Sequence, residues 1–310
     1  MKFKNNISVL LMMVFVGLSL KSYGQQDPHF TQYMYNTMSV NPGYTGSTGG
    51  LTLASLARVQ WVGLDGAPQT QTFSAHSPIG YSGVGVGLNF MNDKLGPANE
   101  IFIDGNVSYT VRLSEVGNFA VGLRLGGTIL NVDWNRGDFR DKADDAFAQN
   151  INNDFLPTIG AGFYYYTDKS YIGLSVPNFL ETKHFDNSNG QFSVGKERLH
   201  YFLIGGHVFD LNSTLKLKPA FIAKAVTGSP LSFDVSVNAL FHDRFTAGLA
   251  YRWDDSVSGL LGFQITNRFF MGYAYDMTTS NYQSYNNGSH ELMLRYDFLS
   301  GARLKSPRFF

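Results

Sequence analysis

Residues 101–113 read I-F-I-D-G-N-V-S-Y-T-V-R-L, and along most of this stretch apolar residues alternate with polar ones. A period of two is that of a β-strand, whose successive side chains point to opposite faces of the sheet. Residues 119–129 and 231–238 repeat the pattern. The apolar face of the first stretch holds Ile101, Ile103, Val107, Tyr109, Val111 and Leu113, and its polar face holds Asp104, Asn106, Ser108, Thr110 and Arg112.

Less regular runs of similar length fill most of the chain after residue 50. Together with the three clear stretches they predict about fourteen strands, with twelve as the other possible count. A tilted strand needs roughly ten residues to cross an apolar band of about 25 Å, which is near the length of most of these runs. The runs are 51–61, 69–77, 82–91, 156–166, 170–176, 197–209, 214–225, 245–253, 257–265, 268–277 and 289–298.

The composition of the polar face decides between two β-architectures, a secreted soluble sandwich and a membrane barrel. A sheet face in water normally carries many Lys and Glu side chains, whereas this face holds mostly Gly, Ser, Thr and Asn, and only 15% of the chain is charged. We therefore expect an all-β protein, a transmembrane antiparallel up-and-down β-barrel in contact with the lipid bilayer. Aromatic residues near strand ends, such as Tyr164–Tyr166 and Phe269–Phe270, are expected to form interfacial girdles.

The lengths of the predicted links alternate as in bacterial outer-membrane barrels, which have short periplasmic turns and longer outer loops. The longer predicted links are 62–68, 92–98, 133–155, 177–196 and 278–288. Even strand number and short alternate turns place both termini in the periplasm. The sequence thus predicts an integral protein of the bacterial outer membrane.

The N-terminus has the organisation of a secretory signal peptide. Lys2 and Lys4 precede an apolar run over 7–20, and small residues at 22 and 24 suit cleavage after Gly24. The alternative is a membrane-anchoring helix, which needs about 20 apolar residues. The run over 7–20 is shorter than that. The absence of cysteine suits an oxidising compartment. The expected divisions are a signal peptide (1–24), a periplasmic or lumenal segment (25–50), a barrel (51–300) and a periplasmic tail (301–310).

Between the signal peptide and the first strand lies D-P-H-F-T-Q-Y-M-Y-N-T-M-S-V-N-P-G-Y-T-G, residues 27–46. This stretch resembles the N-terminal signature of the PorP/SprF family of the type IX secretion and gliding machinery of Bacteroidota. Thr31, Gly43 and Thr45 depart from the family pattern, and the chain end S-P-R-F-F is also similar. The residues that match the signature are Asp27, Pro28, Phe30, Gln32, Tyr33, Asn36, Asn41, Pro42, Tyr44 and Gly46.

The resemblance implies a non-enzymatic partner of the secretion machinery. It implies export or surface attachment of large adhesins with a type B C-terminal domain, and contact with periplasmic and outer-membrane type IX components. Independently, a barrel of about fourteen strands encloses more space than its own side chains fill. We therefore expect the matching residues to plug the barrel or to dock a partner.

Other candidate sites have structural explanations. The seven histidines, at 29, 76, 184, 200, 207, 242 and 290, lack metal-ligand spacing, and Asp141, Asp144 and Asp145 do not form an EF-hand pattern. The glycines of 83–87 lie within a strand run and are expected to permit curvature. Equal numbers of acidic and basic residues argue against nucleic-acid binding. No cofactor is expected. The competing functions are a passive or ligand-specific channel and an outer-membrane hydrolase.

Overall fold

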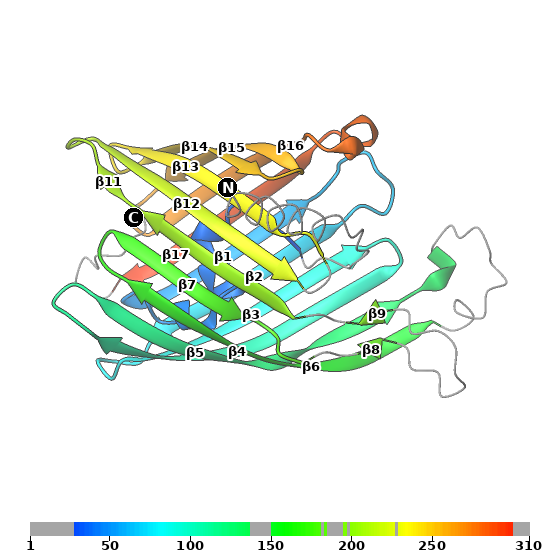
Figure 1. Cartoon of the computed structure of the whole chain (residues 1–310), viewed down its shortest axis with the longest axis horizontal. Helices are drawn as coiled ribbons and strands as arrows, with labels where there is room; N and C mark the ends of the chain where they lie inside the picture. Colours follow the sequence, from blue (N-terminus) through cyan, green and yellow to red (C-terminus); the bar gives the residue numbers. More distant parts are fainter. Residues whose placement is uncertain are drawn as a thin grey trace, which may run out of the picture.

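Fourteen antiparallel strands close into one barrel (Figure 1), because β1 pairs with β17 and β10 pairs with β12. The structure, a computed structural model, describes residues 28–136, 150–180, 183–184, 195–196, 199–226 and 229–299. The predicted signal peptide, Asp27 and the predicted tail lie outside the described residues. The predicted fold and its strand number are confirmed, and the alternative of twelve strands is wrong.

Each strand follows the previous one around the barrel, so that consecutive strands are neighbours. A short extra strand, β11, continues β10 after a break at Val208, whose N–H is donated instead to the carbonyl of Lys169. The strands are β1 (Gly50–Val59), β2 (Gln69–Pro78), β3 (Val84–Leu95), β4 (Ala98–Arg112), β5 (Asn118–Val132), β6 (Ile151–Tyr166), β7 (Ser170–Val176), β8 (Lys183–His184), β9 (Gly195–Lys196), β10 (His200–His207), β11 (Phe209–Asp210), β12 (Leu215–Val226), β13 (Ser232–Phe241), β14 (Phe245–Arg252), β15 (Ser256–Gln264), β16 (Phe269–Thr278) and β17 (Ser289–Leu299).

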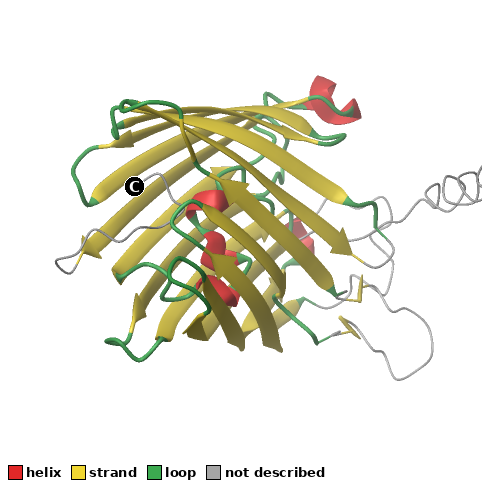
Figure 2. Ribbon diagram, turned by 60° about the vertical axis from the view of Figure 1, so that its left-hand side comes forward, coloured by secondary structure: helices red, strands yellow, loops and turns green. Residues whose placement is uncertain are grey.

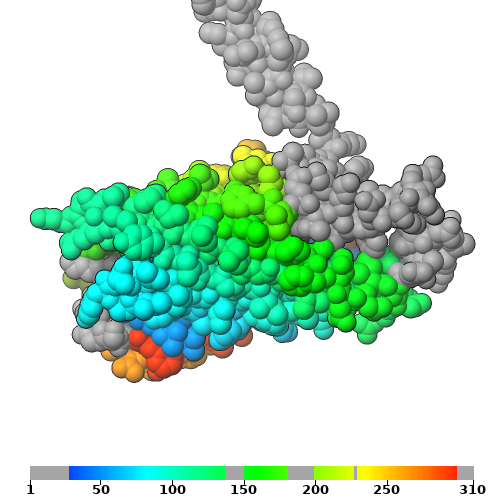
Figure 3. All heavy atoms as spheres, turned by 90° about the horizontal axis from the view of Figure 1, so that it is seen from below, coloured from blue at the N-terminus to red at the C-terminus, as the bar shows by residue number. Residues whose placement is uncertain are grey.

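The apolar side chains of the strands face outward. On β4 the outward Ile103 and Tyr109 are 51% and 56% exposed, whereas the inward Asn106 between them is 4% exposed. The space-filling view shows this outer surface continuous over β4–β6 (Figure 3). In a closed barrel the backbone N–H and carbonyl groups of every strand are hydrogen-bonded to neighbouring strands. A hydrocarbon environment requires this, because lipid tails offer no hydrogen-bonding partner. No helix in the described parts of the chain is long and apolar enough to cross a membrane.

The longer links lie at one end of the barrel, as predicted. This end, which we call the outer end, carries the links 60–68, 133–150, 177–199 and 279–288, while the other end carries turns such as 113–117 and 242–244. Two outer links were predicted too long. Residues 92–95 and Ala98 continue the β3–β4 ladder, so that only Gly96 and Pro97 form the turn, and residues 151–155 belong to β6. Polar side chains do not prevent pairing there, and Thr70 donates a hydrogen bond to Asp93 on the neighbouring strand (2.6 Å).

The predicted aromatic girdles are partly wrong. Tyr164 and Phe270 are 2% and 1% exposed and point into the barrel, whereas Tyr251 on β14 and Phe298 on β17, which are also near strand ends, face outward. Strand-end position alone did not distinguish the two faces, because inward aromatic residues near an end can pack on material inside the barrel. What they pack on is the N-terminal segment described below.

Adjacent residues on β3 test the orientation of the faces. Leu88 is 64% exposed on the outer surface and Asn89 points inward. We expect Leu88→Asp to lose most of the folded barrel from the outer membrane, since a charge near the bilayer midplane costs about 2 kcal/mol or more. Asn89→Ala should be tolerated, because the Met38 carbonyl to which Asn89 donates (3.4 Å) also accepts from Arg124 (2.7 Å). Folded protein is measured by its heat-modifiable band after electrophoresis of membranes, and equal loss in both variants would contradict the orientation.

Candidate functional site in the barrel interior

The interior of the barrel is filled by residues 28–49, which we call the N-terminal segment. It forms three short 3-10 turns, η1 (Tyr33–Tyr35), η2 (Thr37–Ser39) and η3 (Pro42–Tyr44), drawn inside the barrel in Figure 2. Asn41 caps the last turn by accepting the Gly43 N–H on its Oδ1 (2.8 Å), and the proline that follows it suits the first position of a helical turn. The segment is therefore ordered by its own sequence as well as by the barrel.

A buried ion cluster holds the beginning of the segment. Glu291 on β17 accepts the backbone N–H of Thr31 (2.9 Å) and of Gln32 (2.8 Å). Arg58 on β1 lies between two carboxylates, 2.7 Å from Asp276 and 3.1 Å from Glu291, and all three side chains are at most 3% exposed. The Thr31 hydroxyl lies 2.8 Å from the Asp276 carboxylate. One guanidinium and the donors of the segment thus balance two buried carboxylates.

Further contacts along the segment use its backbone carbonyls. The Arg124 guanidinium on β5 donates to the carbonyls of Met38 (2.7 Å) and Ser39 (2.9 Å). The hydroxyl of Ser175 donates to the Val40 carbonyl (2.8 Å), and that of Ser108 donates to the Thr45 carbonyl (2.6 Å). These donors belong to β4, β5 and β7. The irregular backbone of the segment is therefore satisfied by side chains of the wall.

Glycines in the wall make room for the segment. A Cβ at Gly122 would overlap the Pro42 carbonyl and the Gly43 nitrogen, and one at Gly162 would overlap the Asn41 side chain. Gly85 likewise faces the Thr45 carbonyl at 2.5 Å from its ideal Cβ position. The prediction that glycines in 83–87 serve curvature was therefore incomplete. Gly85 is needed because backbone approaches backbone there.

Aromatic side chains pack the segment against the wall. Tyr44 meets Tyr164 edge to face at 5.4 Å between ring centroids, and Tyr35 lies 5.1 Å from Phe270. The Lys218 ammonium lies over the Tyr35 ring at 5.7 Å. Such aromatic and cation–π contacts each contribute about 0.5–2 kcal/mol when desolvated. They explain why the inward aromatic residues of β6 and β16 lie near strand ends.

The segment runs lengthwise through the barrel. Thr31 contacts residues at the outer ends of β16 and β17, namely Asp276 and Glu291. Gly46, in contrast, donates its N–H to His76 (3.2 Å), close to the opposite end of β2. The chain therefore descends from the outer half of the lumen to the periplasmic edge, where β1 begins.

Seven of the ten residues of the predicted motif are buried, and so are most of the residues between them. Asn41, Gln32 and Tyr33 are at most 3% exposed. Pro28 borders a cavity above the segment, and Gly46 has a positive φ of 70° beside Gly85. Asp27 lies outside the described residues. The sequence thus identified the segment, and whether it plugs the barrel in function stays a prediction.

Sequence reasoning missed the wall residues that hold the segment, above all Arg58, Asp276 and Glu291. Their signal was present, because each is a charged residue on the inward phase of a strand. Nothing in the sequence indicated that Arg58 meets the two carboxylates, since β1 reaches the consecutive strands β16 and β17 only when the barrel closes.

The other candidate sites remain scattered. His29 lies 3.3 Å from the Lys224 ammonium, and burial, reinforced by that charge, lowers the pKa of His29 below its usual range. His207 pairs with Ser170, and His290 with Tyr273. Within the described ranges no three His, Asp or Glu side chains gather to hold a metal ion. Asp141, Asp144 and Asp145 lie outside the described residues.

A family model described as type IX secretion system membrane protein PorP/SprF matches residues 22–296. The chain belongs to the PorP/SprF family. This membership and the closed barrel make the protein an integral outer-membrane component associated with the type IX secretion machinery. No curated protein matched the sequence.

Solved structures similar to this PorP/SprF-family barrel are outer-membrane proteins. The CymD monoaromatic hydrocarbon channel is 11% identical with a TM-score of 0.51, over 86% of this chain and 94% of its own. Omp33 of Acinetobacter baumannii is 7% identical (TM-score 0.49; 82% and 100% covered), and a Pseudomonas aeruginosa FadL homologue is 13% identical (0.47; 90% and 96%). At these identities CymD supports the fold alone.

The buried ion cluster gives a first test of what holds the segment. We expect Arg58→Met to lower stability by about 3–5 kcal/mol, because it leaves two buried carboxylates without their cation. The matched control is Lys216→Met, which breaks an ion pair with Asp243 (2.6 Å) at the barrel end; exposed pairs contribute about 0–1 kcal/mol. Urea unfolding of the purified barrels in lipid vesicles measures both, and similar midpoints would contradict the assignment.

A second test uses the wall glycines. Gly122→Ala should prevent the segment from seating at Pro42, because the new methyl group would overlap the backbone. Gly259→Ala is the control, since a Cβ there meets no atom within 4 Å. Limited proteolysis of purified protein should cut residues 28–49 in the first variant only. Equal protection of the segment in both variants would show that the close approach at Gly122 is unimportant.

Proposed function

We propose that the chain is a non-enzymatic subunit of the type IX secretion and gliding machinery that supports export or surface attachment of large adhesins with a type B C-terminal domain. Family membership supports the link to the machinery. The adhesin, the gliding role and the absence of catalysis are part of the proposal. In this function the barrel is a scaffold, whose ends contact periplasmic and outer-membrane components.

The observation that carries the proposal is the immobilised N-terminal segment. The residues from Pro28 to Gly46 that the family signature shares with this chain lie in the lumen, and Asn41 among them is 0% exposed. A solute channel needs a polar path, whereas this segment is fixed by buried ion pairs, wall donors and close glycine contacts. A permanently filled barrel suits an anchoring role.

The second candidate is a passive or ligand-specific channel. The cavity above the segment, about 120 Å³ in volume, favours it, since part of the lumen is not filled by protein. For solutes to cross, however, the segment would have to move away from the wall. The two functions therefore differ in whether movement of the segment is needed.

A disulfide that fixes the segment distinguishes the two functions. The Cβ position of Gly43 lies 3.1 Å from the Tyr164 Cβ, close to the roughly 3.5–4.5 Å of a disulfide. The chain has no native cysteine, so Gly43→Cys with Tyr164→Cys forms one defined pair. We expect cells with the oxidised pair to display adhesin at the wild-type level, measured by antibody on intact cells. Deletion of the gene should abolish display.

The single-cysteine variants control for the loss of the Tyr164 ring. Purified wild-type protein and the oxidised double-cysteine variant should both show no single-channel conductance in planar bilayers. Conductance that the oxidised pair blocks and a reductant restores would favour the channel. Normal display in the deletion strain would refute the export role.

A further inference from the structure

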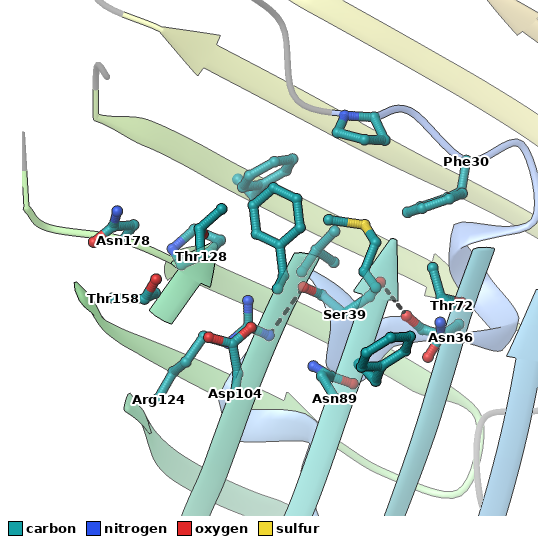
Figure 4. A pocket seen from close by; sticks show the side chains of 17 residues that line it. Phe30, Asn36, Ser39, Thr72, Asn89, Asp104, Arg124, Thr128, Thr158 and Asn178 are labelled. Atoms are coloured by element: carbon teal, nitrogen blue, oxygen red, sulfur yellow. Dashed lines mark hydrogen bonds between the residues drawn. The ribbon is translucent and has the colours of Figure 1, made fainter. Parts of the chain in front are cut away.

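A cavity lies in the outer half of the barrel, above the N-terminal segment (Figure 4). Its wall residues belong to the outer halves of their strands, as Thr72 does on β2, Thr128 on β5 and Thr158 on β6. Phe30 and Val40 of the segment also line it. Because the segment continues from there to the periplasmic edge, a ligand would reach this cavity from the outer face.

The volume of the cavity, about 120 Å³, suits one ring-sized group. For comparison, an apolar cavity of about 150 Å³ in another protein binds benzene. Four phenylalanines line it, and three of them, Phe30, Phe102 and Phe202, belong to separate elements. Aromatic linings favour an aromatic ligand through offset or edge-to-face contacts.

Opposite Phe30, polar side chains gather at one side of the cavity. Asp104 and Arg124 lie next to each other there, with Thr158 nearby (Figure 4). Asp104 is 6% exposed, and its Oδ1 accepts no hydrogen bond from the residues that the structure describes. A buried carboxylate with unused acceptor capacity favours a ligand that donates a hydrogen bond.

The charges at this side oppose an ionised ligand. The Asp104 carboxylate and the Arg124 guanidinium balance, and Arg124 is held by the carbonyls of Met38 and Ser39 and by Asn106. An ammonium ligand would meet the Arg124 charge, and a carboxylate ligand would meet Asp104. An uncharged donor avoids both repulsions and the cost of burying a charge.

We infer that this cavity binds a small uncharged aromatic group carrying a hydroxyl donor, that is, a phenol. The ring lies among the phenylalanines and the hydroxyl donates to the Asp104 carboxylate. The same chemistry occurs in a free phenol and in a tyrosyl side chain of another protein at the cell surface. This inference does not depend on the role in secretion.

The test is calorimetric titration of the purified full-length protein in detergent with 4-ethylphenol, benzylamine and benzoate. We expect saturable one-to-one binding of 4-ethylphenol, and affinity about tenfold or more lower for the two ions. N-acetyltyrosine amide forms a separate arm; tighter binding than 4-ethylphenol identifies a peptide source, and weaker binding identifies a free phenol.

Two variants locate the site. Asp104→Asn should weaken 4-ethylphenol binding about tenfold or more, as expected for loss of a charge-assisted hydrogen bond. Asp243→Asn, the same change in a turn at the periplasmic end, should have no effect. Thr158→Trp should fill the cavity and abolish binding. Any signal that 4-ethylphenol still gives with this variant measures its partitioning into detergent and is subtracted.

Absence of saturable binding by folded wild-type protein would overturn the inference. Undiminished binding in Asp104→Asn or Thr158→Trp would do so as well. Preference for benzylamine would show a cation site and contradict the uncharged ligand. Folding of each variant is checked by its heat-modifiable band.

Discussion

Hydrocarbon offers no partner for a backbone N–H or carbonyl, and this constraint determines the architecture. The fourteen strands avoid an open edge only because β1 and β17, the first and last strands in sequence, pair over their whole length. Closure places apolar side chains outside and small polar ones inside. It also creates an interior that must be filled by something other than the strands.

The N-terminal segment occupies that interior. Its irregular backbone is buried there, so its N–H and carbonyl groups also need hydrogen-bonding partners. The wall provides donors at fixed positions, such as Arg124 and Ser175, and the acceptor Glu291. Gly122 allows the two backbones to approach without a side chain between them, and Gly162 leaves room for the Asn41 side chain. Segment and wall are thus complementary in charge, hydrogen bonding and shape.

This complementarity divides the lumen into two parts with different properties. The periplasmic half is occupied by packed turns, where Tyr44, Tyr164 and Tyr171 form one buried cluster. The outer half keeps a cavity beside Asp104. The chain thus occupies the periplasmic half of its own barrel and leaves a cavity in the outer half, and the proposed scaffold role and the proposed ligand site both rest on this arrangement.

The sequence by itself determined the strands, their facing and the family. A period of two along residues 101–113 is a local property, readable without knowing any partner strand, and so is the motif around Asn41 and Pro42. The sequence could not show which residues meet across the lumen. Arg58 lies more than two hundred residues from Asp276 and Glu291, and only closure brings them together. For the same reason Tyr164 was misassigned to a girdle, and only the tertiary structure showed the role of Gly85. Tyr164 and Gly85 both pack against the N-terminal segment, which is distant in sequence, so the alternation within their own strands could not indicate that contact.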